Sequence, residues 1–260
     1  MEGEILDVIL KVSLLVFVVS SMLAMGLSLT VAQIIDPLRS LRLVLIALAA
    51  NFVAVPLIGW GIAELLSLEE GLAIGLTIMA VAAGAPFLPK LAAAANGSVA
   101  FSVGLMVLLM VVTVAYMPLV LPLLISGVEV NPWDIASSLI FLMLLPLGIG
   151  LLVRARYEDA AAGFQPLMTQ TSTIAIALLL VAGVIVNFDN IVELVGTGGF
   201  IAIVLFLAAT MVVGYLGGGR DPAVRSVLGL GTAQRNLSAA LVVAGQNFSD
   251  TRGVLTFIFV

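Results

Sequence analysis

Apolar runs of roughly twenty residues follow one another along almost the whole 260-residue chain. A transmembrane helix needs about 20 mostly apolar residues, so this succession constrains the fold more than any short motif does. Only 10% of the residues are charged, whereas soluble domains carry about 25%. A chain with so few charges cannot cover a water-facing surface. We therefore predict an all-α integral membrane protein that is solvated by the lipid bilayer.

The apolar runs predict nine membrane spans, with boundaries accurate to a few residues. They are expected at 5–32, 41–63, 71–95, 98–126, 133–153, 165–187, 198–217, 223–247 and 251 onward. The ninth span is expected to be incomplete, because the chain stops at Val260 inside an apolar run. Acidic residues precede the first run, whereas a cleaved signal peptide begins with basic residues, so we expect the first run to be a retained span.

The loops between the spans alternate in charge. One set carries Arg39, Arg42, Arg154, Arg156, Arg220 and Arg225. The other set carries Glu64, Glu69, Glu70, Glu129, Asp134, Asp189 and Glu193. Because cytoplasmic loops are enriched in Lys and Arg, we expect the arginine loops to face the cytoplasm. This orientation leaves the N-terminus outside, and we expect the location to be a bacterial inner (plasma) membrane.

Two of the predicted spans are interrupted. Span 71–95 contains Pro86 and Pro89, which lack an amide proton and clash with the preceding turn. Span 223–247 contains two glycines followed by the polar cluster Thr232, Gln234, Arg235 and Asn236. Both spans then resume with small residues, as LAAAA and LSAAL. Because the two spans run in opposite directions, this likeness favours an inverted repeat with two broken helices.

A broken membrane helix has specific chemical consequences. Unpaired backbone groups are tolerated at bilayer depth only when they are buried in protein or line a wet cavity. The carbonyls that end the first half attract cations, and the N–H groups that begin the second half attract anions. Transporters built from inverted repeats bind their substrates at such breaks. We therefore predict a binding site here; the alternative is a proline kink that only shapes packing.

Apart from bases at the span ends, the only two bases within the central spans are Lys90 and Arg235, one in each interrupted span. Arg235 has roughly a dozen residues of span on either side, at about 1.5 Å each, so it lies too deep to reach an interface easily. A base at this depth costs about 2.5–3.5 kcal/mol. Apart from Asp134 at the edge of its span, no Asp or Glu lies in a central span, so carbonyls, amides, water or a bound anion must compensate the charge. For Lys90, an alternative is extension of its side chain to the cytoplasmic interface.

Several functions are disfavoured by missing residue types. The chain has no Cys and no His, which removes thiol nucleophiles, imidazole bases and the usual zinc ligands. It has neither a phosphate-binding loop nor a basic tract for nucleic acid. We therefore expect no enzymatic activity, no cofactor and no nucleic-acid partner. A cation/proton antiporter and a non-transporting membrane receptor stay open, although such an antiporter usually needs a membrane-embedded carboxylate.

Four segments, in this order and spacing, resemble the bile acid:sodium symporter family. MLAMGLSLT at Met22–Thr30 resembles the first family signature, and NFVAVP at Asn51–Pro56 sits where members have an amide, an aromatic and then a proline. NGSVAFSVGL at Asn96–Leu105 follows the first crossover as in that family, and GTAQRNLSAAL resembles the second crossover. The resemblance covers nearly the whole chain.

The resemblance implies ten helices in two inverted five-helix repeats, with a core domain and a panel domain. This chain is expected to lack the first helix, as some members do, which agrees with nine spans and an external N-terminus. We therefore expect residues 1–260 to form one transmembrane transporter domain. A shortened first repeat would cover 5–126 and a second repeat would cover 133–260.

The resemblance also implies sodium-coupled uptake of organic anions, with two sodium ions near the crossovers. By position, however, the family's Ser-Asn pair falls at Leu88 and Pro89, and its key glutamate falls at Gly231. The family's glutamine falls at Arg235 when Asn236 is aligned with the family's asparagine. The ligand set for sodium is therefore not intact.

Two polar residues agree better with the family. Ser102 keeps a serine of the next helix, although a threonine one turn further on becomes Met106, and Asn51 keeps amide chemistry in place of a glutamine. An alternative role for Asn51 and Ser102 is ordinary hydrogen bonding between helices.

We therefore hypothesise that Lys90 and Arg235 face each other across the breaks and replace the two sodium ions. The predicted binding site for a small organic anion comprises Lys90, Arg235, Gln234, Asn236, Thr232, Asn51 and Ser102. The coupling ion stays open between sodium and a proton, since a buried lysine can lose its proton.

Overall fold

The computed structural model describes residues 2–125, 131–186, 188–193, 196–248 and 253–259. Within these ranges the chain forms helices and connections and no strand, so the prediction of an all-α chain is confirmed. Residue Glu129, the predicted ends of spans 98–126 and 165–187, and the predicted start of the ninth span at 251 lie outside the described residues.

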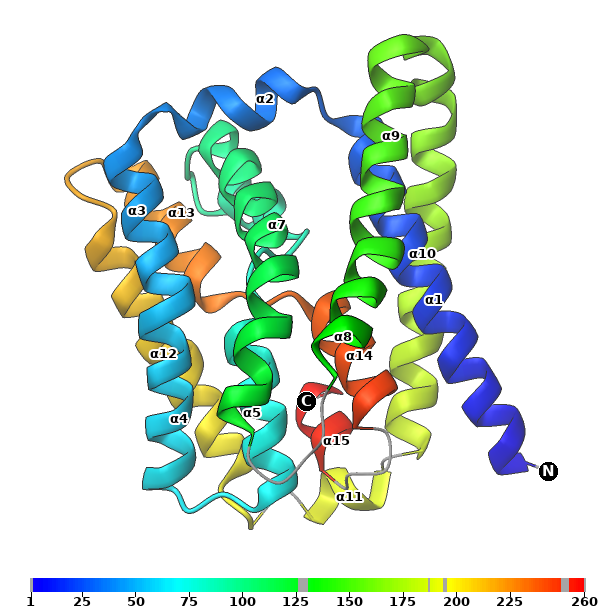
Figure 1. The fold of residues 1–260 in the computed structure, drawn as a ribbon, viewed down its shortest axis with the longest axis vertical. Coiled ribbons are helices and arrows are strands. Elements are labelled where there is room, and N and C mark those ends of the chain that lie inside the picture. Colours follow the sequence, from blue (N-terminus) through cyan, green and yellow to red (C-terminus); the bar gives the residue numbers. More distant parts are fainter. Residues whose placement is uncertain (1, 126–130, 187, 194–195, 249–252, 260) are drawn as a thin grey trace.

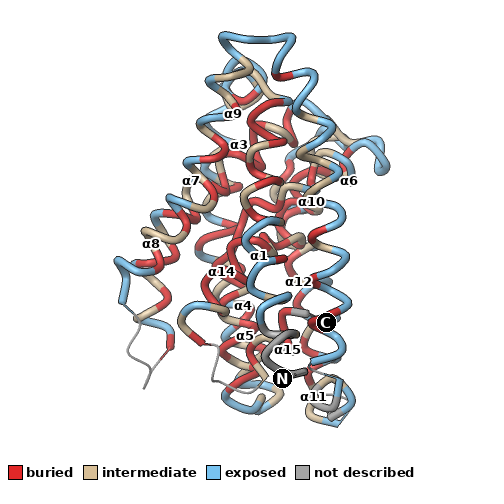
Figure 2. The backbone as a smooth tube through the Cα atoms, turned by 90° about the vertical axis from the view of Figure 1, so that its right-hand side faces the viewer, coloured by how far each residue is buried: buried red, intermediate tan, exposed pale blue. Residues whose placement is uncertain are grey.

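Within the described residues, six helices are long and apolar enough to cross a membrane. They are α1 (Glu2–Ser28), α3 (Leu41–Ala49) continued by η2 (Ala50–Ala54) and α4 (Val55–Leu65), α7 (Val99–Leu124), α8 (Pro132–Leu139) continued by η3 (Ile140–Leu144) and α9 (Leu145–Arg156), α10 (Glu158–Val186) and α12 (Gly199–Gly217). Only 22–44% of the residues in their most apolar windows are buried. Most of these residues are therefore not buried (Figure 2), and many of the exposed ones are large hydrophobic residues, which suits contact with lipid.

The other three predicted spans are not continuous helices of that length. Span 71–95 consists of α5 (Glu70–Val81) and α6 (Leu88–Ala94), and span 223–247 consists of α13 (Pro222–Ala233) and α14 (Leu237–Asn247). The ninth is described only as α15 (Val254–Phe259). Both predicted interruptions are therefore present, while the total of nine spans stays a prediction.

The predicted span 165–187 begins several residues after the start of the observed helix. Helix α10 starts at Glu158, directly after the turn at Tyr157, and contains Pro166. Glu158 and Asp159 lie in its first turn, where carboxylates favour the positive end of the helix dipole. Hydropathy alone does not detect a polar first turn of this kind.

The helices pack in two groups with a buried middle layer (Figure 1). Helices α1, α9 and α10 contact one another, and we call them the three-helix bundle. On the other side α12 packs against α3, α4 and α13. Helices α5, α7 and α14 lie between these groups, and residues 238–244 of α14 are almost entirely buried.

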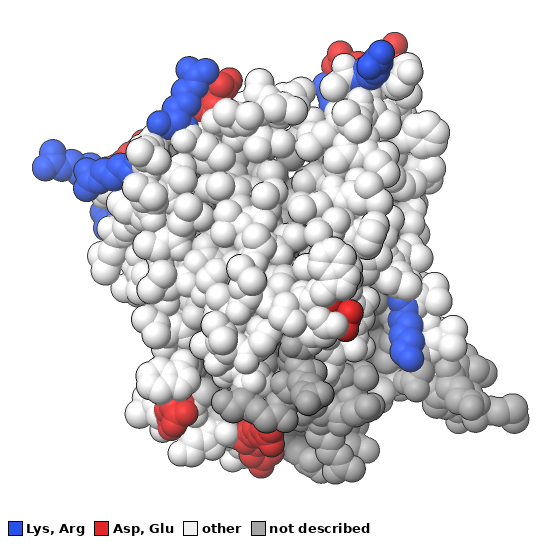
Figure 3. All heavy atoms as spheres, in the orientation of Figure 1, with Lys and Arg blue, Asp and Glu red and all other residues white. Residues whose placement is uncertain are grey.

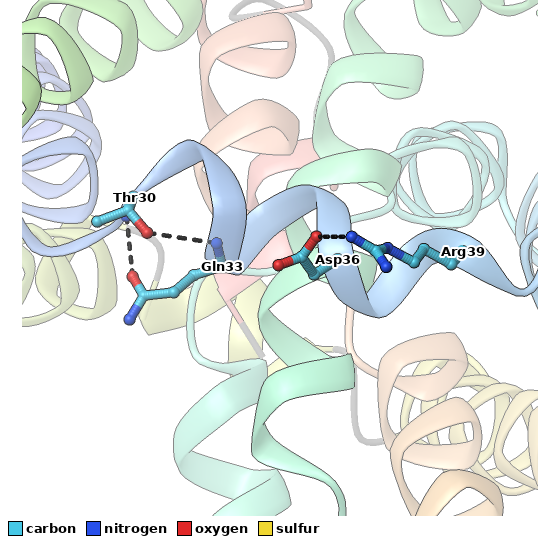
Figure 4. Close-up of polar contacts among 4 residues, drawn as sticks. All are labelled: Thr30, Gln33, Asp36 and Arg39. Atoms are coloured by element: carbon cyan, nitrogen blue, oxygen red, sulfur yellow. Dashed lines mark hydrogen bonds and ion pairs between the residues drawn. The ribbon is translucent and has the colours of Figure 1, made fainter.

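The bundle is connected to α3 by α2 (Val31–Ile35) and η1 (Asp36–Arg39), which cross the end of α7. Thr30 caps α2 by a reciprocal pair of hydrogen bonds with Gln33, at 2.9 and 3.3 Å (Figure 4). Arg39 pairs with Asp36 at 2.8 Å in the next turn. This connection lies at one end of the molecule, where it joins the two helix groups.

Charged side chains gather at the two ends of the molecule, and the middle of the visible face is almost uncharged (Figure 3). Most Lys and Arg lie at the end that carries α2 and the turn between α9 and α10, whereas the opposite end shows mainly Asp and Glu. This separation agrees with the alternation of arginine and acidic loops along the sequence.

Candidate functional site

The two interruptions meet in the interior of the molecule. The backbone N–H of Asn236 donates to the carbonyl of Ala82 at 2.8 Å, and its side-chain amide donates to the carbonyl of Gly84 at 3.1 Å. Helix α13 packs on α6, and α14 packs on α5. The two interrupted helices therefore cross at their breaks, and we call residues 82–87 and 234–236 the crossing.

Local sequence explains why both helices stop here. Gly84 has φ of +83°, a left-handed conformation that favours glycine. Pro89 lies at the start of α6, where its missing N–H leaves no bond unmade. Asn236 is the N-cap of α14, and its side chain accepts a hydrogen bond from the N–H of Ala239 at 3.1 Å. Helices α6 and α14 therefore each begin at a residue that favours a helix N-terminus.

Arg235 lies at the centre of the crossing and is only 6% exposed. Its Nε donates to the carbonyl of Met79 at 3.1 Å, and Nη2 donates to that of Ala80 at 3.3 Å. Its Nη1 donates to the carbonyl of Thr232 at 2.8 Å and to Oδ1 of Asn51 at 3.0 Å. Four of the five N–H donors of the guanidinium are therefore used, and none of the four acceptors is a carboxylate.

Three of these four acceptors belong to helix ends. Met79 and Ala80 lie in the last turn of α5, and Thr232 lies in the last turn of α13. A helix C-terminus carries a partial charge of about −0.5, so two of them together offer about −1. The guanidinium is thus balanced by two converging helix ends, which explains how it is buried without a carboxylate.

A π-helical turn holds Asn51 beside Arg235. Pro56 cannot donate a hydrogen bond to the carbonyl of Phe52, and the hydroxyl of Tyr116 donates to that carbonyl at 2.6 Å. The distortion produces the π turn η2, which contains Asn51. The amide nitrogen of Asn51 donates to the hydroxyl of Thr232 at 3.3 Å. The amide is therefore oriented with its oxygen toward the guanidinium.

The predicted site residues divide into two sets. Arg235, Asn51 and Thr232 are joined by hydrogen bonds, and Asn236 links the two breaks. Gln234 lies in the same segment as the C-cap of α13, and its Oε1 is buried with no hydrogen-bond partner in the described chain.

The second set lies apart from the guanidinium. The Lys90 side chain is exposed, and its Nζ lies 5.2 Å from the ring centre of Phe87. Ser102 is fully buried, but its hydroxyl donates to the carbonyl of Val99 in its own helix at 2.6 Å. The expectation that Lys90 and Arg235 face each other is therefore corrected: Lys90 follows the break on the exposed side of the short helix α6, and only Arg235 points into the crossing.

Two hydroxyls were not expected at the crossing. Thr113 of α7 accepts a hydrogen bond from the N–H of Ala83 at 3.0 Å and lies 3.1 Å from the carbonyl of the same residue, to which it donates. Ser238 of α14 is 1% exposed, and its hydroxyl has no partner in the described residues. The sequence could have identified Thr113, because it is a single hydroxyl residue in an otherwise apolar run. Such a hydroxyl commonly forms a hydrogen bond with another helix.

The described residues contain no group of three or more His, Cys, Asp or Glu side chains that would hold a metal ion. The oxygen atoms that surround the guanidinium are three backbone carbonyls and one amide oxygen. Neutral oxygens of this kind at helix C-termini coordinate monovalent cations in transporters. In this chain the cation that they hold is the side chain of Arg235.

Comparison with known proteins agrees with the membrane architecture. The chain is similar to an Arabidopsis thaliana protein described as "Probable sodium/metabolite cotransporter BASS3, chloroplastic", with 23% identity over 239 residues. The matched region covers 90% of this chain and 56% of that protein, so the chain spans about half the length of its curated relative. The sequence model of the Sodium Bile acid symporter family matches residues 14–194, which is more than half of the chain. The chain therefore belongs to the sodium bile acid symporter family.

Proposed function

We propose that the chain is a secondary transporter of a small organic anion, and that the anion binds at the crossing. The observation that carries this proposal is the buried guanidinium of Arg235 between two interrupted helices. Membership of a symporter family supports transport, and interrupted helices are the usual place of substrate sites in transporters of this kind.

The charge of Arg235 makes the crossing suitable for an anion. Without it, the carbonyls of two helix ends would give the site a negative potential and repel a carboxylate or sulfonate. The guanidinium cancels this potential and keeps one N–H on Nη2 free of the four bonds described. Gln234 Oε1 lies in the crossing and the Ser238 hydroxyl lies two residues after it, and neither has a hydrogen-bond partner among the described residues. They offer polar contacts to the substrate, while Lys90 contributes only long-range attraction.

The wider architecture fits alternating access. We interpret α5–α6 and α13–α14 as the matching broken helices of two inverted repeats, at 5–126 and 133–260, and the three-helix bundle as the panel domain. Movement of the bundle relative to the crossing would expose the site to each side in turn. We orient the arginine-rich end toward the cytoplasm and the N-terminus outside, in a bacterial inner membrane.

A comparison of two arginine variants tests the anion site. Thermal unfolding of the purified protein first identifies which of a panel of carboxylates and sulfonates stabilises it most. Uptake of that ligand into proteoliposomes is then measured for each variant. Arg235→Gln is expected to reduce uptake at least tenfold (about 1.4 kcal/mol). Arg225→Gln is the matched control, because Arg225 lies near the end of α12 with its guanidinium 4.1 Å from the ring centre of Tyr215. Equal effects of the two substitutions would place Arg235 outside the site.

A further inference from the structure

We propose that the crossing is a monovalent cation site with a permanently attached occupant, and that neutralising Arg235 converts it into a sodium site. The consequence for transport rests on the proposed function: uptake by this chain does not require a sodium ion at the crossing. The cation site itself follows from the geometry of the described residues and holds for the protein whether or not an anion is transported.

The first step is the composition of the site. Four oxygens from α5, η2 and α13 lie 2.8–3.3 Å from the guanidinium nitrogens. Carbonyl and amide oxygens are ligands that hard cations accept. These four converge on one charged group at bilayer depth, where an uncompensated cation is expensive. The same oxygens would therefore be left facing one another if the guanidinium were removed.

The second step is the charge. The two helix C-termini together supply a potential equivalent to about −1, and none of the four acceptors is a carboxylate. This potential balances one unit of positive charge and would undercompensate a divalent ion. Sodium is therefore a suitable monovalent probe of the empty site.

The third step is the rigidity of the site. The backbone on both sides of Arg235 is fixed, because Gln234 donates to Leu230 and Asn236 donates to Ala82, each at 2.8 Å. Asn51 is independently held by Thr232. Asn51 and the backbone at 234–236 are therefore held by bonds that do not involve the guanidinium. Glutamine at position 235 would add one more neutral oxygen within reach.

The test compares thermal unfolding of the purified protein in sodium chloride and in choline chloride at equal ionic strength. We expect the wild-type chain and Arg235→Lys to unfold at the same temperature in both salts, within about 1 °C. Arg235→Gln is expected to unfold at least about 5 °C higher in sodium chloride, as mass action predicts for an ion bound only by the folded state.

Each outcome of this test supports or overturns either the inference or the proposed function. A sodium response of about 5 °C in the wild-type chain would show that an unoccupied sodium site already exists. An Arg235→Gln variant that folds but responds equally to sodium and choline would show that the oxygens do not form a cation site. If Arg235→Gln is recovered only when it is prepared in sodium, the inference is supported. If neither salt yields folded Arg235→Gln, the inference is overturned, because sodium then fails to replace the guanidinium. Absence of anion uptake with the sodium response intact would contradict the proposed function alone.

Discussion

The crossing and the three-helix bundle both bring backbones into close approach, but by different physical means. In the bundle, Gly26 of α1 and Gly150 of α9 lie so close that a Cβ on Gly26 would come within 2.3 Å of the carbonyl oxygen of Leu147. The helices there are continuous, so their backbone bonds are satisfied internally and small residues suffice for packing. At the crossing the helices are open, and Arg235, Asn236 and Thr113 must supply the missing partners.

The comparison shows why polar side chains concentrate at one depth of this protein. Irregular backbone inside a membrane is stable only where protein groups replace water. The bundle avoids this requirement, and the crossing meets it with a buried charge. The same requirement therefore places the proposed anion site and the proposed cation site at the crossing. Four substitutions, ordered by expected effect, separate these two kinds of contact.

Gly84→Ala should have the largest effect. A Cβ at this position would lie 2.3 Å from the backbone N of Met110, and φ is +83°. Strain and the clash together predict a loss of about 3 kcal/mol or more in the free energy of unfolding. Thermal unfolding in detergent measures it. Gly61→Ala is the control, since a Cβ on Gly61 meets nothing within 4 Å, and a similar loss there would remove the contrast.

Gly26→Ala should have an intermediate effect, because the clash is similar but φ lies outside the left-handed region that strains a side chain. We expect a loss of about 1–3 kcal/mol from displacement of α1 relative to α9. Anion affinity of the folded fraction should change less than twofold. Gly148→Ala in α9 is the matched control, because a Cβ added at Gly148 would meet nothing within 4 Å. A large loss of anion affinity in Gly26→Ala would show that the bundle also shapes the site.

Thr113→Val should destabilise the crossing by about 1–3 kcal/mol, because the N–H and carbonyl of Ala83 both lose their partner. Thr77→Val is the control: its hydroxyl bonds the carbonyl of Ala73 within the same helix, at 2.8 Å. We expect the control to change stability by less than about 0.5 kcal/mol. Hydrogen exchange at Ala83 provides a local readout, and unchanged protection in Thr113→Val would contradict this account.

Lys90→Gln should have the smallest effect. The side chain is exposed and contacts Phe87 rather than Arg235. We expect the unfolding temperature to stay within about 1 °C and anion uptake to fall by no more than about threefold, in keeping with a weak long-range attraction. Uptake at two salt concentrations checks this. A tenfold loss would mean that Lys90 is a direct ligand and that the two positive charges act together.

Much of this architecture was predictable from particular residues. Pro86 and Pro89 disfavour a regular helix, and Arg235 lies too far from either predicted span end to reach water easily, so the sequence predicted both interruptions and a deep charge. The hydrogen-bond acceptors of the guanidinium could not be predicted, because backbone carbonyls such as those of Met79 and Ala80 have no sequence signature.

The direction of Lys90 was not predictable either. It depends on how α6 restarts after the break, and one residue of difference there rotates a side chain by about 100° around the helix. Ser102 shows the limit of reasoning from family position. The residue type agrees with the resemblance, but its hydroxyl bonds its own helix at Val99 instead of the crossing.

Equilibrium binding of radioactive sodium to the purified chain tests the central claim most directly. If the guanidinium of Arg235 occupies a cation site at the ends of α5 and α13, Arg235→Gln should bind one more sodium ion per chain than the wild type, saturably and with little competition from choline. Equal sodium binding by the two proteins, or less by the variant, would contradict the account.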